Sequence, residues 1–209
     1  MTNKNTALFA LLLLGSFLTQ SCILPEANHV EPDFYLLALP DYEQNRTDRR
    51  SSPAPTFYLR EIELPQYLKD NRLVFRPSME SIEFREYHRW GEPLGDGISR
   101  VLGNNLAQRL GTFSYSVFPN RRKNGPQMEI AISILAFEKS SDGKAVLDAL
   151  IEIRDLGGET FRDSFQTSSP LAGEGESSEV HALSHCLGKL SQKLTDLILA
   201  NQSSTNLAK

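Results

Sequence analysis

The amino-acid sequence predicts an α/β fold in which a mixed sheet, containing antiparallel hairpins, is flanked by two main helices. Two segments in the middle of the chain alternate apolar and polar residues with a period of two, which is typical of half-buried strands. Two other segments repeat apolar residues every three or four positions, which indicates helices that each bury one face. Because helices are few and the strands cluster together, we expect a single domain with the helices packed on the sheet.

Short strands are predicted first. Residues 34–39 favour a strand that ends at Pro40, and residues 41–55 are polar and proline-containing, so we expect a flexible loop there. Residues 57–64 favour a second strand, but their apolar positions change parity midway, which a β-bulge would explain. Two further strands are expected, at residues 73–75, closed by Pro77, and at residues 82–90.

The first helix is predicted at residues 93–110. Its apolar residues lie on one helical face, namely Ile98, Val101, Leu102, Leu106 and Leu110. Asp96 is placed to cap the amino end, and Gly111 is placed to end the helix in the left-handed conformation. Residues 115–118 are then expected to form a short strand.

The clearest pattern predicts an antiparallel hairpin. Residues 128–134 and 145–154 both alternate with a period of two, and the Ser140-Ser141-Asp142-Gly143 segment between them is typical of a turn. Residues 155–158 predict a second turn, after which residues 161–165 are expected to pair back as a third strand.

A second helix closes the predicted domain. Residues 167–178 are rich in Ser, Gly and Glu and are predicted to be a second flexible loop, at the end of which Ser177 or Ser178 can cap the helix. Its apolar stripe consists of Leu183, Leu187, Leu190, Leu194 and Leu197, with Ile198 alongside. We expect the domain to span residues 34–201 and residues 202–209 to form a polar tail.

The amino-terminal stretch is typical of an exported protein. Lys4 precedes a continuous apolar run at residues 7–18, and Cys22 follows directly after the polar spacer of residues 19–21. The run is shorter than the ~20 apolar residues that a membrane-spanning helix needs. A cysteine at the cleavage point predicts a lipoprotein signal at residues 1–21, with Cys22 acylated. The alternative is an ordinary signal peptide that leaves Cys22 as a free thiol, since Thr19 and Gln20 depart from the usual lipoprotein pattern.

The residue after the predicted lipidation site bears on which membrane holds the protein. In enteric-type bacteria an aspartate at that place retains lipoproteins in the inner membrane, and here it is Ile23. We therefore expect the periplasmic face of the outer membrane rather than the inner membrane. Residues 22–33 would form the tether between the acyl chains and the domain.

Charge and cysteine content exclude several classes of protein. With 22 basic and 26 acidic residues the formal charge is −4, so the chain lacks the basic surface that binds nucleic acid. It also lacks a basic stripe for anionic lipids, which leaves the acyl chains on Cys22 as the expected membrane contact. The chain has two cysteines. If Cys22 is acylated, Cys186 has no partner for an intramolecular disulfide.

Catalytic and metal motifs are weak. His181 and His185 are four apart on the second helix, as in helical zinc pairs, but Cys186 lies about 100° round the helix, and a structural zinc needs about four ligands. We therefore favour surface histidines beside a small, packed cysteine over a metal site. The chain has no Gly-x-Ser-x-Gly elbow and no phosphate-binding glycine loop. We expect no catalytic residue, no cofactor and no enzymatic activity.

The segment Tyr87-His88-Arg89-Trp90 is the candidate partner-binding site. Tyr, Arg and Trp are over-represented at binding hot spots, and Trp90 is the chain's one tryptophan. The alternative is structural, with Trp90 in the core and Arg89 paired to a nearby carboxylate.

Motifs between residues 62 and 106 resemble those of one known family. They are Leu-Pro-Gln-Tyr-Leu at 64–68, Leu-Val-Phe-Arg at 73–76, Trp-Gly-Glu-Pro-Leu at 90–94 and Gly-Ile-Ser-Arg-Val-Leu at 97–102. In this order they resemble the ABC-type transport auxiliary lipoproteins, which include the lipoprotein of the Pqi-type intermembrane transport system. The rest of the mature chain agrees with that family in its pattern.

The resemblance implies a non-enzymatic accessory subunit with a mixed sheet flanked by helices. It also implies partners: an MCE-domain protein, an ABC permease and an ATPase that together move lipid between membranes. The resemblance leaves open whether the protein forms a homo-oligomer. The alternative function is a periplasmic carrier that holds lipid in its own apolar pocket.

Overall fold

The computed structural model describes residues 30–38, 54–121 and 125–207, with side chains described up to residue 200. The predicted signal peptide, Cys22, most of the predicted tether and most of the 41–55 loop lie outside these residues. In chain order the elements are β1 (Asp33–Tyr35), β2 (Phe57–Leu59), the 3-10 helix η2 (Gln66–Lys69), β3 (Arg72–Ser78), β4 (Ser81–Trp90), α2 (Leu94–Leu110), β5 (Tyr115–Val117), β6 (Met128–Ser140), β7 (Lys144–Asp155), β8 (Thr160–Pro170) and α3 (Glu176–Leu207).

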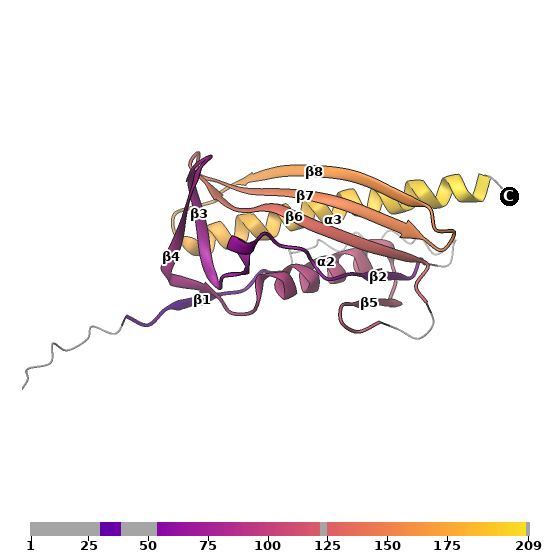
Figure 1. The fold of residues 1–209 in the computed structure, drawn as a ribbon, viewed down its shortest axis with the longest axis horizontal. Helices are drawn as coiled ribbons and strands as arrows, with labels where there is room; N and C mark the ends of the chain where they lie inside the picture. Colours follow the sequence, from indigo (N-terminus) through magenta and orange to yellow (C-terminus); the bar gives the residue numbers. More distant parts are fainter. Residues whose placement is uncertain (1–29, 39–53, 122–124, 208–209) are drawn as a thin grey trace, which may run out of the picture. The chain divides into compact units, whose positions relative to one another are not determined.

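The strands form one mixed sheet, which confirms the predicted fold class. Within the described residues it has eight strands, and β6 is its centre (Figure 1). One edge of β6 pairs with β7 along its length, and β8 extends that side. The other edge is shared, because β2 pairs with the beginning of β6 and β3 with its end. Beyond these lie β5 next to β2, and β4 and β1 next to β3.

The predicted hairpin of β6 and β7 is confirmed. The two strands are antiparallel, and the apolar residues of their alternating pattern are buried, including Ile130, Ile132, Leu147 and Ile151. The buried side of β7 contacts α3, which also contacts β8 and α2. Both helices therefore pack on the face of the sheet where the apolar residues point, and the alternate residues of β6 and β7 stand on the opposite, open face.

The helices bury most of the predicted apolar residues, and Leu110 and Leu197 are half-buried. In α2, Ile98, Val101, Leu102 and Leu106 are fully buried, and the helix ends at Gly111 with φ 65°. In α3, Leu183, Leu187, Leu190 and Leu194 are at most 1% exposed. The predicted caps are wrong in detail. Pro93 occupies the position before α2 and makes no side-chain cap, while Asp96 lies inside the first turn.

The parity change in residues 57–64 has a structural counterpart. The ladder of β2 with β6 pairs Leu59 with Ile130, and an isolated bridge further on pairs Glu63 with Ser133. Between these two pairs the β2 side contains one residue more than β6. The extra residue turns Arg60 and Glu61 to solvent and returns Ile62 to the core.

Several predicted boundaries differ from the structure, and the strand predicted at residues 57–64 is observed as β2 only over Phe57–Leu59. The first strand ends at Tyr35, and β3 continues through Pro77 to Ser78, where its register with β4 is irregular and a missing N–H is tolerated. The predicted loop at 167–178 is shorter, because β8 stays paired with β7 as far as Pro170 and α3 already begins at Glu176. Helix α3 also continues through the predicted polar tail to Leu207, since extending a long helix adds one hydrogen bond per residue fixed.

Candidate functional site

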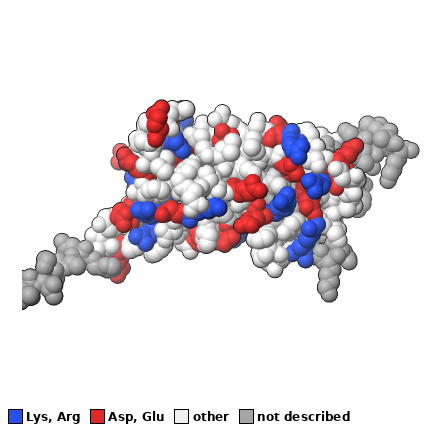
Figure 2. Space-filling model, in the orientation of Figure 1, with Lys and Arg blue, Asp and Glu red and all other residues white. Residues whose placement is uncertain are grey.

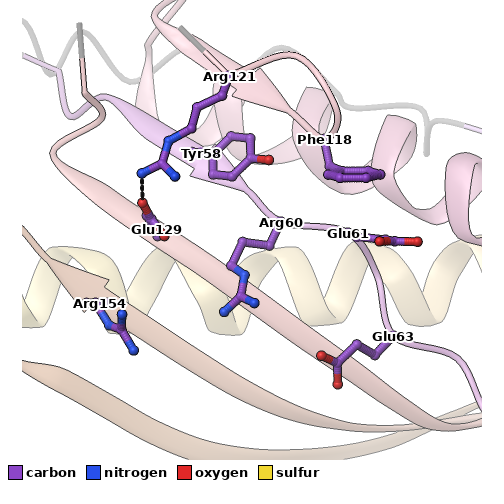
Figure 3. Close-up of a pocket in the computed structure, with 8 residues that line it drawn as sticks. All are labelled: Tyr58, Arg60, Glu61, Glu63, Phe118, Arg121, Glu129 and Arg154. Atoms are coloured by element: carbon purple, nitrogen blue, oxygen red, sulfur yellow. Dashed lines mark hydrogen bonds and ion pairs between the residues drawn. The ribbon is translucent and has the colours of Figure 1, made fainter. Parts of the chain in front are cut away.

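A groove of about 460 Å³ lies on the open face of the sheet, where β2, β6 and β7 run side by side. Eight residues line it: Tyr58, Arg60, Glu61, Glu63, Phe118, Arg121, Glu129 and Arg154. Figure 3 shows these side chains in front of the strands, with α3 behind them. We call this site the charged groove. Its volume is within the ~300–1,000 Å³ range of small-ligand pockets.

The register of the sheet brings the groove residues together. Tyr58 of β2 lies opposite Glu129 of β6, and Glu129 lies opposite Arg154 of β7. The next open-face residue of β6 is Ala131, which is small, so the side chain of the neighbouring Arg60 finds room over the sheet. Arg60 is held at this level by its own backbone, whose N–H donates to the carbonyl of Ile130 at 2.8 Å.

Some of the charges in the groove are paired and others are not. Arg121 pairs with Glu129 and lies over the Tyr58 ring, and Glu63 accepts a 2.6 Å hydrogen bond from the Ser133 hydroxyl. Among the described residues, Arg60 and Glu61 make no side-chain hydrogen bond or ion pair and are exposed. Figure 2 shows that acidic and basic side chains are interspersed on the face of the molecule that it draws.

The four residues of the predicted partner-binding segment have different environments at the end of β4. Trp90 is 7% exposed and belongs to the hydrophobic core. Arg89 lies 3.9 Å from Glu86, as the structural alternative expects, whereas Tyr87 is 48% exposed. The paired strand β1 adds Phe34, which is 64% exposed, opposite Arg89. The exposed part of this segment is therefore Tyr87 with the outer side of β1.

His88 belongs to a cluster of ionisable groups between β1, β4 and the beginning of α3. Its Nδ1 is 3.2 Å from the Tyr35 hydroxyl, and its Nε2 is 3.6 Å from Glu176. Glu176 accepts a 3.1 Å hydrogen bond from Arg85. Glu179, one turn further along α3, is 1% exposed, and its Oε1 has no hydrogen-bond partner. Burial raises the pKa of Glu179 to about 7, against the lowering effect of Arg85 and Lys139.

The buried carboxyl of Glu179 predicts a pH-dependent stability. Between its ordinary pKa of 4.5 and about 7 the folded protein keeps a proton that the unfolded chain has lost. The free energy of unfolding therefore falls as pH rises through this window, by up to about 3 kcal/mol. We expect Glu179→Gln to match the wild type near pH 4 and to exceed it in stability at pH 8, measured by urea unfolding. Equal stability of the two proteins at pH 8 would contradict this.

A second buried carboxylate is closed to ligands by its own partners. Glu138 is 2% exposed and pairs with Arg76 at 2.6 Å, while its other oxygen accepts hydrogen bonds from the Tyr67 hydroxyl and the Phe137 N–H. Burial and Glu138 raise the pKa of Tyr67 to about 12, so this phenol stays protonated. Because each oxygen of Glu138 has a partner, this cluster is a structural tie between η2, β3 and β6.

The two histidines of α3 are not joined by the neighbouring cysteine in a set of metal ligands. His181 and His185 are exposed with ring centroids 6.0 Å apart, whereas Cys186 is fully buried and directs its S–H at the carbonyl of Ala145. Burial raises the pKa of the Cys186 thiol to about 11, so it packs as a small apolar group. In the part of the chain that the structure describes, no three His, Cys, Asp or Glu side chains come close enough to hold a metal ion.

Comparison with known proteins identifies the family. A protein-family model for the ABC-type transport auxiliary lipoprotein component matches residues 35–195, which is most of the chain. The chain belongs to this family. No curated protein matches it. None of the helices described for this auxiliary lipoprotein is long and apolar enough to cross a membrane.

Solved structures share the fold of this auxiliary lipoprotein. The crystal structure of an uncharacterized protein matches with a TM-score of 0.68 at 16% identity, covering 81% of this chain and 99% of its own. Protein XCC0632 from Xanthomonas campestris matches with a TM-score of 0.62 at 13% identity, covering 84% of this chain and 97% of its own. At these identities the likeness concerns the fold.

The charged groove is absent from the sequence-based predictions. Its residues come from four separate segments, and alternating charges on the exposed side of strands are common on any protein surface. The one local signal was the parity change in residues 57–64, because it turns Arg60 and Glu61 outward together.

Proposed function

We propose that this auxiliary lipoprotein is a non-enzymatic accessory subunit of an MCE/ABC-type intermembrane lipid transport system. Acyl chains on Cys22 would hold it at the periplasmic face of the outer membrane, and an MCE-domain protein, working with an ABC permease and its ATPase, would dock on the folded domain. The family match over residues 35–195 is the observation that carries this proposal.

The fold supports an accessory role over the alternative of a lipid carrier. A carrier needs an apolar pocket large enough for acyl chains. The charged groove has six charged residues among its eight and lies open on the sheet, so it does not offer that environment. The interior between the sheet and the helices is occupied by a continuous cluster of buried apolar side chains.

The exposed end of the β1–β4 pair is the proposed contact for the MCE-domain protein. Tyr87 and Phe34 expose large aromatic surface there, and aromatic residues with a nearby arginine are typical of interface hot spots. In sequence, β1 directly follows the proposed tether. A docked partner would therefore meet the domain close to where the tether enters it.

Replacing Tyr87 tests this contact. We expect Tyr87→Ala to reduce co-purification of the MCE-domain protein from crosslinked cells by about tenfold, because a hot-spot side chain is removed without disturbing the core. The matched control is Leu150→Ala, since Leu150 is 47% exposed on the open face of β7, away from β4. Undiminished capture by a folded Tyr87→Ala protein would remove this surface from the proposal.

A further inference from the structure

We propose that the charged groove binds the headgroup of a zwitterionic phospholipid, with its phosphate on the arginines and its ammonium on the glutamates. This inference rests on the proposed role in lipid transport, and adds to it a place on this chain where the transported molecule would be recognised. The first argument is the balance of charge. The lining contains three arginines and three glutamates, so a ligand of either single charge would meet as many repelling groups as attracting ones.

The second argument is which charges are available. Arg121 and Glu129 satisfy one another, so they frame the groove. Arg60 and Glu61 are adjacent in the chain, exposed and without an ion pair among the described residues. Arg154 has only a 3.5 Å contact with Glu152, which is at the limit of a hydrogen bond. The groove thus offers the two weakly engaged guanidinium groups of Arg60 and Arg154 and, on the side of Phe118, the free carboxylate of Glu61.

The third argument is the chemistry of these groups. A guanidinium donates two parallel hydrogen bonds to a phosphate, which is why arginine is favoured at phosphate sites. A primary ammonium donates three hydrogen bonds and is matched by carboxylates such as Glu61 and Glu63. Figure 3 places the Arg60 side chain between Arg154 on one side and Glu63 on the other. The two charges of a phosphoethanolamine group would meet opposite partners along that line.

The aromatic residues define how far a ligand can enter. Tyr58 is buried under Arg121, and Phe118, 47% exposed, borders the groove at the opposite side from Glu129. Two rings do not make an acyl-chain pocket, so the hydrocarbon chains would stay outside, in a membrane or a partner. The groove would therefore bind only the headgroup of a lipid, while the acyl chains of that lipid are held elsewhere.

The test is a binding titration of the mature protein with soluble headgroups. Signals of arginine Nε–H groups in the labelled protein are followed by NMR during addition of glycerophosphoethanolamine. We expect saturable shifts, and binding weaker by about tenfold for glycerophosphoglycerol, which has no ammonium, and for inorganic phosphate. Arg60→Gln is expected to weaken glycerophosphoethanolamine binding by about tenfold. Lys144→Gln is the control, because Lys144 lies outside the groove and pairs with Asp142, which is likewise outside it.

Each other outcome overturns the inference. Equal binding of inorganic phosphate would make the groove a simple anion site, and an equal effect of Lys144→Gln would make the binding non-specific. If Arg60→Gln instead lowers capture of the MCE-domain protein and no headgroup binds, the groove is a protein contact. Capture of the partner by the Arg60→Gln protein is measured in parallel, so that headgroup binding can fail while the proposed accessory function stands.

Discussion

Replacing Cys22 with serine is expected to remove the protein from the membrane fraction and to abolish its labelling by palmitate. The reason is the position of Cys22, directly after an apolar run and a short spacer, where the thiol would be the acylated group. None of the described helices is long and apolar enough to cross a membrane. One acyl chain gives only marginal attachment and two or more give a stable one, so losing the acylated position should release nearly all of the protein.

The matched control for this experiment is the other cysteine. Cys186→Ala changes a thiol that is fully buried against β7 and unavailable for acylation. We expect this variant to keep its palmitate label and its membrane attachment. A Cys22→Ser protein that still carries the label, or that stays with the membranes after a buffer wash, would contradict the proposed anchor.

Replacing Trp90 with alanine is expected to lower the free energy of unfolding by about 3–5 kcal/mol. The side chain is 7% exposed within the main apolar cluster, at the junction of β1, β4 and the loop before α2. Its removal leaves a large cavity, and a loss of this size is a substantial part of the ~5–15 kcal/mol that stabilises a typical domain. Urea unfolding must be followed by circular dichroism, because Trp90 is the only tryptophan and the variant has no indole fluorescence.

Two further variants show whether the loss of stability in Trp90→Ala comes from the cavity. Trp90→Phe should recover most of the lost stability, since it refills the site with an aromatic ring. Tyr87→Ala, at an exposed position three residues earlier, should change the free energy of unfolding by less than about 1 kcal/mol. A loss below about 1 kcal/mol for Trp90→Ala would mean that the site repacks. Because Trp90 is a core residue, Tyr87 is the better position for testing partner capture.

Local patterns were sufficient for the long elements. Apolar residues recur with a period of two in β6 and β7 and with helical spacing in α2 and α3, so the sequence indicates which face of each element is buried. Burial of those apolar side chains is what stabilises the elements. The ends of elements were less predictable, because they depend on neighbours. Strand β8 extends to Pro170 only because β7 is there to pair with it, and no pattern in residues 167–170 indicates this.

The candidate site was predictable only in part. Composition singled out Tyr87 to Trp90 but could not separate exposed Tyr87 from buried Trp90, because both are aromatic and both lie at a strand end. The charged groove could not be predicted from the sequence for another reason. Glu129 and Arg154 are 25 positions apart and meet only through the β6–β7 register, and Tyr58 joins them through a parallel pairing.

The sequence by itself determined which faces of the strands and helices are apolar, and its motifs pointed to the family, because both are properties of residues close together in the chain. Only the tertiary structure decided that β6 carries β2 and β3 on one edge, which sets Arg60, Glu61 and Arg154 around one hollow. That arrangement depends on backbone hydrogen bonds between distant segments. Because these hydrogen bonds join backbone groups that nearly all residues share, no particular side chains mark the pairing of β6 with β2 and β3.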